Sequence, residues 1–243
     1  MRLTRVYVDA PLNEGTRIRL EGSAASHITR VLRLRVGEAL TLFNGLGGEY
    51  AGMIDKAHGG EVTVAIGGRA EIERESPLSL TLAQGVSRGE RMDLVVQKAT
   101  ELGVRSLVPL LTERSVVRLT AQQADRKVNH WRAITIAACE QCGRNHLPAL
   151  ARPKSFGEFL HALKDGGARL LLSPTAALKV EDVPRPVGAA TVLIGPEGGL
   201  ADSEVDAAVR AGFTAVRMGP RVLRTETAAI AALTLLQSEF GDL

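Results

Sequence analysis

The chain has 243 residues, 45% of them hydrophobic, with a formal net charge of +3 and an isoelectric point near 9.1. No apolar run reaches the ~18 residues of a membrane span, residues 1–5 lack the apolar stretch of a signal peptide, and two cysteines are too few for a disulfide framework. These features exclude a membrane-spanning or disulfide-stapled protein and predict a cytoplasmic location.

Residues 1–72 predict a small all-β domain. Glycine-rich turns separate five candidate strands: Arg5–Val8, Thr16–Leu20, Ala39–Phe43, Glu49–Asp55 and Val62–Ile66. Short strands with frequent glycine turns are typical of a small barrel. A charged stretch ending in proline, Glu71–Pro77, predicts a linker to a second domain that covers residues 73–243.

One predicted helix, Ser26 to about Leu34, interrupts these strands. It places His27, Arg30 and Arg33 on one face, because residues three apart in a helix are neighbours. The basic residues of the chain are mostly arginine, 24 against six lysines. Guanidinium groups suit phosphates and base edges, although a genome biased towards arginine codons explains the excess equally well. The face is therefore either a nucleic-acid contact or an ordinary solvated surface.

From residue 78 the pattern changes to strands that alternate with helices. The predicted strands are Leu78–Ala83, Leu107–Leu111, Arg169–Leu172, Thr191–Ile194 and Ala215–Met218. The predicted helices are Glu90–Leu102, Asp125–Cys142, one opened by a capping box at Ser155, Ser203–Ala211 and a final helix from Thr225. This alternation predicts a mostly parallel sheet with helices on both faces.

Several familiar site motifs are absent or incomplete. The sequence lacks a dinucleotide-binding glycine fingerprint, a P-loop, a zinc-protease motif and a nucleophile elbow, which disfavours hydride transfer, ATP hydrolysis and serine hydrolysis. Cys139 and Cys142, followed by His146, have the spacing of a metal or redox site. We expect no metal there, because the pair lies at a helix end and no fourth ligand is evident.

The most informative segment is the glycine-rich turn Gly195–Gly199, which follows a buried strand and precedes the helix caps Asp202 and Ser203. Such a strand–turn–helix junction is where α/β proteins bind ligands, since glycine lets the backbone approach them closely. Glu197 disfavours a phosphate and favours a cationic or hydrogen-bond-donating ligand. The alternative is a purely structural turn.

A second junction of this kind, Arg224-Thr225-Glu226-Thr227, opens the final helix. Thr225 can cap the helix and Glu226 complements the helix dipole, so a capped helix start would explain both residues. Arg224 is a cation at the positive end of a helix, which is unfavourable unless it binds something.

These motifs together resemble the RsmE family of ribosomal RNA methyltransferases, in the SPOUT superfamily. The resemblance rests on five segments in order: residues 27–33, 98–104, 140–144, 194–199 and 218–228. It implies a PUA-like β-barrel in residues 1–72 that helps to hold RNA. It also implies, in residues 73–243, a SPOUT-type α/β methyltransferase domain whose last segment threads a trefoil knot.

The resemblance further implies a homodimer that uses S-adenosylmethionine to methylate N3 of one uridine in 16S rRNA, on the small ribosomal subunit. A SPOUT ribose 2′-O-methyltransferase is the enzymatic alternative, and an inactive RNA-binding ribosome assembly factor is the non-enzymatic one. The expected cofactor pocket follows three strand ends and reaches the final helix: Leu172, Ser173, Gly195, Pro196, Glu197, Gly198, Met218, Leu223 and Thr225.

Methylation of uridine N3 requires loss of the N3 proton and stabilisation of charge on O2 and O4. Arg224 is the expected donor to those oxygens. Glu226 is the candidate base, with solvent as the alternative. The residues expected to contact RNA are His27, Arg30, Arg33 and Arg144.

Overall fold

The computed structural model describes residues 4–164, 166–184 and 188–243; residues 1–3, the start of the expected first domain, lie outside it. Backbone contacts divide the chain into two compact units. The first comprises the chain up to Glu75 together with Ile136–Leu147, and the second comprises Ser76–Thr135 and Pro148–Leu243. The predicted boundary after residue 72 does not include residues 136–147, which belong to the first unit by their contacts.

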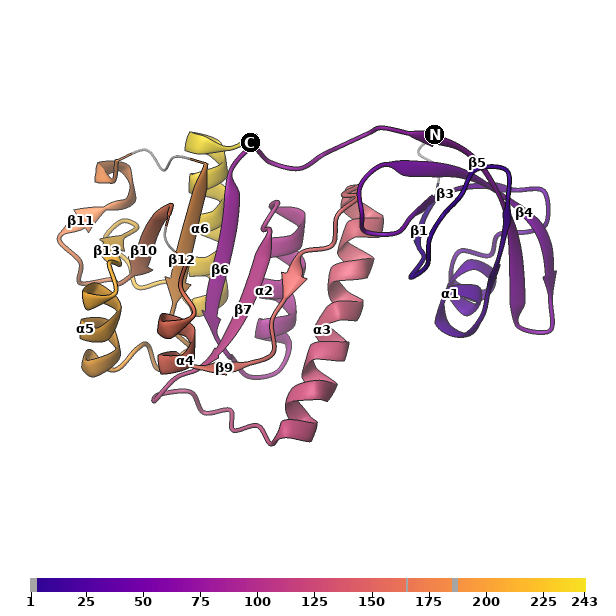
Figure 1. Ribbon diagram of the computed structural model, residues 1–243. Helices are drawn as coiled ribbons and strands as arrows, with labels where there is room; N and C mark the ends of the chain where they lie inside the picture. The colour runs from indigo at the N-terminus through magenta and orange to yellow at the C-terminus, as the bar shows by residue number, and fades with distance from the viewer. Residues whose placement is uncertain (1–3, 165, 185–187) are drawn as a thin grey trace. The chain divides into compact units, whose positions relative to one another are not determined.

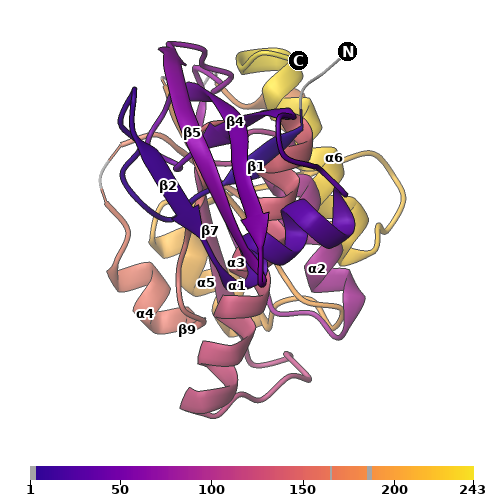
Figure 2. The ribbon, with the colours of Figure 1, turned by 90° about the vertical axis from the view of Figure 1, so that its right-hand side faces the viewer.

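The first unit is built on a five-stranded sheet with the order β1-β3-β4-β5-β2. Figure 2 shows its strands β2, β5 and β4 side by side. Its strands are β1 (Arg5–Tyr7), β2 (Arg17–Leu20), β3 (Ala39–Phe43), β4 (Glu49–His58) and β5 (Glu61–Ala70). Along β5, Val62, Val64 and Ile66 are buried while the residues between them are half-buried, as expected for a strand with one face on a core. Among the described residues β1 and β2 are the edges, so the expected barrel is seen as an open sheet.

The expected helix of residues 26–34 differs in form. A short α1 (Gly22–Ser26) continues into a π-helical turn, η1 (His27–Val31), in which the Leu32 N–H donates to the His27 carbonyl at 2.9 Å. Arg33 lies beyond this turn with a φ of +55°, in the left-handed region. The prediction that His27, Arg30 and Arg33 share one regular helical face is therefore wrong, because the wider π-helical turn and the left-handed backbone at Arg33 break the three-residue spacing.

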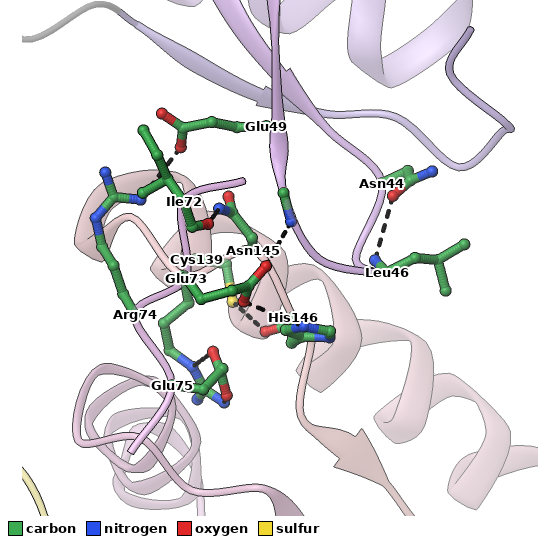
Figure 3. Close-up of polar contacts among 12 residues, drawn as sticks. Asn44, Leu46, Glu49, Ile72, Glu73, Arg74, Glu75, Cys139, Asn145 and His146 are labelled. Carbon is green, nitrogen blue, oxygen red and sulfur yellow. Dashed lines mark hydrogen bonds and ion pairs between the residues drawn. The ribbon is translucent and has the colours of Figure 1, made fainter. Parts of the chain in front are cut away.

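The expected linker is bound to its own unit over residues 72–75 (Figure 3). The Asn145 side chain donates to the Ile72 carbonyl, and Glu73 accepts a hydrogen bond of 2.6 Å from the Gly48 N–H. Arg74 donates to the Gly143 carbonyl at 2.8 Å. The charged residues that marked the linker in the sequence thus hold residues 143–145 in the first unit.

The second unit contains a parallel sheet with the order β11-β13-β10-β12-β6-β7-β8, with β9 also paired to β7 (Figure 1). Its strands are β6 (Ser79–Gly85), β7 (Ser106–Leu111), β8 (Ala149–Leu150), β9 (Lys154–Ser155), β10 (Ala168–Leu172), β11 (Leu178–Lys179), β12 (Ala189–Ile194) and β13 (Thr214–Arg217). Every strand pair in this sheet is parallel, as predicted.

Helices cover both faces of this sheet, and a short 3₁₀ turn, η2 (Val180–Asp182), follows β11. The helices are α2 (Glu90–Glu101), α3 (Ala121–Cys142), α4 (Phe156–His161), α5 (Asp202–Arg210) and α6 (Thr225–Phe240). Val192 of β12 belongs to a core with α2, α6 and Trp131 of α3, whereas Leu193 belongs to a core with α4 and α5. Consecutive side chains of a strand point to opposite faces of the sheet, so Val192 and Leu193 pack against different layers of helices. No described helix combines the length and apolar character needed to cross a membrane.

Candidate active site

A pocket of about 290 Å³ lies at the carboxyl ends of β10, β12 and β13 and at the start of α6. Parallel neighbours end at the same edge of a sheet, so the loops after these three strands meet there. The lining residues are Leu172, Ser173, Pro174, Ile194, Pro196, Glu197, Gly198, Gly199, Val216, Arg217, Met218, Gly219, Arg221, Val222, Leu223, Thr225 and Ala228. The pocket is therefore built from the loops that the sequence singled out.

All the predicted cofactor residues line this pocket except Gly195. The Gly195 carbonyl instead accepts a hydrogen bond of 2.7 Å from the Thr225 hydroxyl. A Cβ added to Gly195 would lie 2.9 Å from the carbonyl carbon of Gly199. Gly195 thus makes the close turn beneath the pocket wall, and Thr225 has its hydroxyl proton committed within the protein.

Nine further residues line the pocket beside the predicted ones. They lie in the same loops, at the ends of β12 and β13, or in α6: Pro174, Ile194, Gly199, Val216, Arg217, Gly219, Arg221, Val222 and Ala228. The sequence did carry a signal for most of these residues. The loop after a parallel strand faces the ligand region along its whole length, so all residues that follow β13 could have been included in the predicted pocket.

Glu197 has a cationic partner inside the chain. Its Oε1 accepts hydrogen bonds from the Arg88 N–H at 3.0 Å and from Arg91 Nη1 at 2.9 Å. Partial burial acts to raise the pKa of the Glu197 carboxyl, but the Arg88 and Glu197 N–H groups and the Arg91 guanidinium outweigh it and hold that pKa below its usual value. The carboxylate therefore joins the glycine turn to the loop before α2.

The two residues expected to act on the substrate flank the first turn of α6. Arg224 is the N-cap residue; it is exposed and makes no side-chain capping hydrogen bond. Glu226 is half-buried, and its Oε2 is buried without a hydrogen-bond partner among the described residues. Neither residue lines the pocket itself. Their catalytic roles remain predictions.

The residues expected to contact RNA differ in exposure. Arg30 and Arg33 are exposed, whereas His27 is half-buried with Nε2 3.7 Å from Glu140 Oε2. Arg144 is 3% exposed, and its guanidinium pairs with the Glu75 carboxylate. The expectation that Arg144 reaches RNA is wrong for this structure, because its donors are buried and bound within the first unit.

The cysteine motif lies at the end of α3, where the Cys139 side chain is buried. The Cys139 thiol donates to the His146 carbonyl at 3.6 Å (Figure 3). A hydrogen bond with the Cys142 side chain and burial raise the pKa of the Cys139 thiol far above its usual range, which disfavours the thiolate that a metal requires. Among the described residues, no group of three or more His, Cys, Asp or Glu residues could hold a metal ion.

Two family models match the chain. An RNA methyltransferase domain matches residues 74–237, and an RNA methyltransferase PUA domain matches residues 20–67. The ribosomal RNA small subunit methyltransferase E of Buchnera aphidicola from Schizaphis graminum is 33% identical over 100% of this chain and 98% of its own length.

Solved structures extend the similarity to three dimensions. A Legionella pneumophila protein solved with the bound cofactor SAM has a TM-score of 0.96 at 42% identity, with both chains fully covered. The ribosomal RNA small subunit methyltransferase E of Neisseria gonorrhoeae, bound to S-adenosylmethionine, has a TM-score of 0.93 at 36% identity, again with full coverage. On this similarity over its whole length, the chain belongs to the RsmE family of small-subunit ribosomal RNA methyltransferases.

Proposed function

We propose that this chain transfers a methyl group from S-adenosylmethionine to N3 of one uridine in the 16S rRNA of the small ribosomal subunit. The observation that carries the proposal is the pocket at the ends of β10, β12 and β13. Relatives that hold S-adenosylmethionine share the whole fold with this chain. The family membership supplies the small-subunit rRNA as substrate class.

The pocket wall is largely apolar. Leucine, isoleucine, valine, methionine and proline side chains and the glycine turn make up most of it, which suits an adenine and an aliphatic chain, and two arginines, Arg217 and Arg221, also line it. Gly198 lines the pocket and also packs closely against another segment, because a Cβ there would lie 3.1 Å from the Arg114 carbonyl oxygen. Leu172, Met218 and Leu223 would hold the apolar parts of the cofactor, and the bound sulfonium would supply the methyl group.

The chain must also prepare the uridine. N3 carries a proton, and its loss places negative charge on O2 and O4. Arg224 is exposed at the start of α6, next to the pocket residue Thr225, and would donate to one of these oxygens. Glu226, two residues after Arg224, has a carboxylate oxygen without a hydrogen-bond partner in the described part of the chain and is the candidate proton acceptor. Solvent is the competing acceptor.

The same membership supports a SPOUT-type fold in which the last segment passes through a trefoil knot. The Gly195 carbonyl and the first helical residue of α6 are hydrogen-bonded across 30 positions of sequence, which brings the two segments of such a knot together. The protein would act as a homodimer in the cytoplasm. Leu235 of α6 is 42% exposed and supplies apolar surface for a partner subunit.

The test is mass mapping of methylated nucleosides in rRNA from cells that lack this protein. We expect one 3-methyluridine of 16S rRNA to disappear and to return with the wild-type gene. Loss of a ribose-methylated nucleoside would instead identify a 2′-O-methyltransferase. An unchanged nucleoside profile with a subunit assembly defect would identify an RNA-binding assembly factor.

A further inference from the structure

Gln84 is a fully buried polar residue near the carboxyl end of β6. It stands opposite Ile194, the last residue of β12, in the parallel register of the two strands. The glycine turn begins at the next residue, Gly195. The Gln84 side chain therefore lies at the point where the pocket loop leaves the sheet.

The contacts of this side chain join two walls of the pocket. Gln84 Nε2 donates to the Thr225 hydroxyl at 2.8 Å, and it lies 3.4 Å from the Gly195 carbonyl oxygen. The Thr225 hydroxyl in turn donates to the same Gly195 carbonyl at 2.7 Å. The amide thus closes a three-membered network that connects β6, the glycine turn and the first residue of α6.

The residue after Gln84 shows how tightly this junction is built. A Cβ added to Gly85 would collide with the backbone nitrogen of Pro196 and lie 2.9 Å from the carbonyl carbon of Gly195. The end of β6 is consequently in backbone contact with the glycine turn. The position of that turn is set by Gln84 and Gly85 together.

We propose that Gln84 is a positioning residue for cofactor binding, holding the glycine turn and the first turn of α6 in register across the pocket. It does not line the pocket, so it acts through Gly195 and Thr225 rather than by touching the cofactor. This inference rests on the proposed function, because it assigns the role toward S-adenosylmethionine.

The carbonyl oxygen of the Gln84 side chain argues that this residue does more than fill space in the core. Its Oε1 is buried and has no hydrogen-bond partner among the described residues. A buried acceptor left unpaired is costly, and an apolar side chain of similar shape would avoid that cost. The amide bonds other segments only through its N–H donors, and the two acceptors belong to the glycine turn and to the first residue of α6.

The test compares Gln84→Met, which keeps the length of the side chain and removes its donors, with Gln237→Met. Gln237 is also fully buried in the second unit, but it donates to the Leu102 carbonyl at 2.7 Å and does not line the pocket. Each purified protein is titrated with S-adenosylmethionine by calorimetry, well below its unfolding temperature. We expect Kd to rise at least about tenfold for Gln84→Met and to stay at the wild-type value for Gln237→Met.

A folded Gln84→Met protein with the wild-type Kd would overturn the inference and leave the proposed function intact. Equal weakening by Gln237→Met would also overturn it, because any loss of a buried amide would then have the same effect. If Gln84→Met does not fold, Gln84→Asn keeps the amide but shortens the side chain away from the Thr225 hydroxyl, and it must raise Kd likewise. A wild-type protein that does not bind S-adenosylmethionine would overturn the proposed function and this inference with it.

Discussion

The guanidinium of Arg144 forms two hydrogen bonds with the carboxylate of Glu75, from Nε to Oε1 at 2.9 Å and from Nη2 to Oε2 at 2.6 Å. The two side chains are only 4% and 12% exposed. Arginine–carboxylate pairs of this two-pronged geometry are strong and directional. Here the pair ties the segment after β5 to the segment after α3, within the first unit.

Breaking this pair should destabilise the protein rather than weaken RNA binding alone. Arg144→Ala removes the guanidinium from the buried Glu75 carboxylate, and breaking a buried ion pair in this way typically costs about 3–5 kcal/mol. Chemical denaturation should show this decrease in the free energy of unfolding. The double variant Arg144→Met with Glu75→Leu should recover much of it, because both charges of the pair are removed together. A fully stable Arg144→Ala protein would show that the pair is not structural.

The pocket could be predicted because it follows from local patterns. The strand Thr191–Ile194, the turn Gly195–Gly199 and the caps that follow are adjacent in sequence, and parallel strand order brings the other loops to them. The capping box at Ser155 is likewise local: Ser155 and Glu158 bond to one another as predicted. Features that depend on residues within one turn or one strand were therefore predicted correctly from the sequence.

The errors involve partners distant in sequence. Nothing in the local sequence distinguishes Arg144 from an exposed arginine, because its partner Glu75 lies 69 positions earlier in the chain. Gln84 gives no signal in a strand of apolar residues, because its acceptors are 111 and 141 positions away. The π-helical form of η1 also depends on packing, since Ile28 is fully buried in the core of the first unit. Such features need the tertiary structure.

Glu197 should make stability depend on pH at the acidic end. Its pKa is lowered in the folded protein, so the carboxylate form is favoured by folding. The stabilisation is therefore complete above the usual carboxyl pKa and is lost as the pH falls through the lowered folded value. Unfolding measured between about pH 7 and pH 3 should show a smaller acid-induced loss in Glu197→Gln than in the wild type. Parallel curves for the two proteins would exclude this contribution.

Gly198→Val should abolish binding of S-adenosylmethionine while the chain stays folded. Gly198 lines the pocket, and a Cβ there would lie 3.1 Å from the Arg114 carbonyl oxygen, so the larger side chain must shift this part of the pocket wall. Gly157→Ala is the matched control, because a Cβ there meets no atom within 4 Å and the residue lies outside the pocket. Calorimetry with circular dichroism checks both points. Wild-type affinity in a folded Gly198→Val protein would refute the pocket assignment.

Arg30 and Arg33 remain candidates for phosphate contact, because both are exposed although they do not share a regular helical face. The variant with Arg30→Ala and Arg33→Ala should bind 16S rRNA fragments more weakly and with a flatter dependence of log affinity on log salt. Arg210→Ala removes an exposed charge from α5 and serves as the control. An unchanged slope in the double variant would mean that these side chains are only solvated.

Arg224 and Glu226 should affect turnover in different ways. Loss of a donor to the charge that develops on uridine typically lowers turnover by ~10²–10³-fold, so Arg224→Ala should reduce kcat at saturating RNA and leave cofactor affinity unchanged. A rise in the KM for RNA with kcat preserved would show instead that Arg224 binds substrate and transition state equally.

Glu226→Gln keeps the size of the side chain but is a far poorer proton acceptor, so it should remove the acidic limb of the pH–rate profile. A profile identical to that of the wild type would identify solvent as the acceptor, and the unpartnered Glu226 Oε2 would then have no part in the proton transfer.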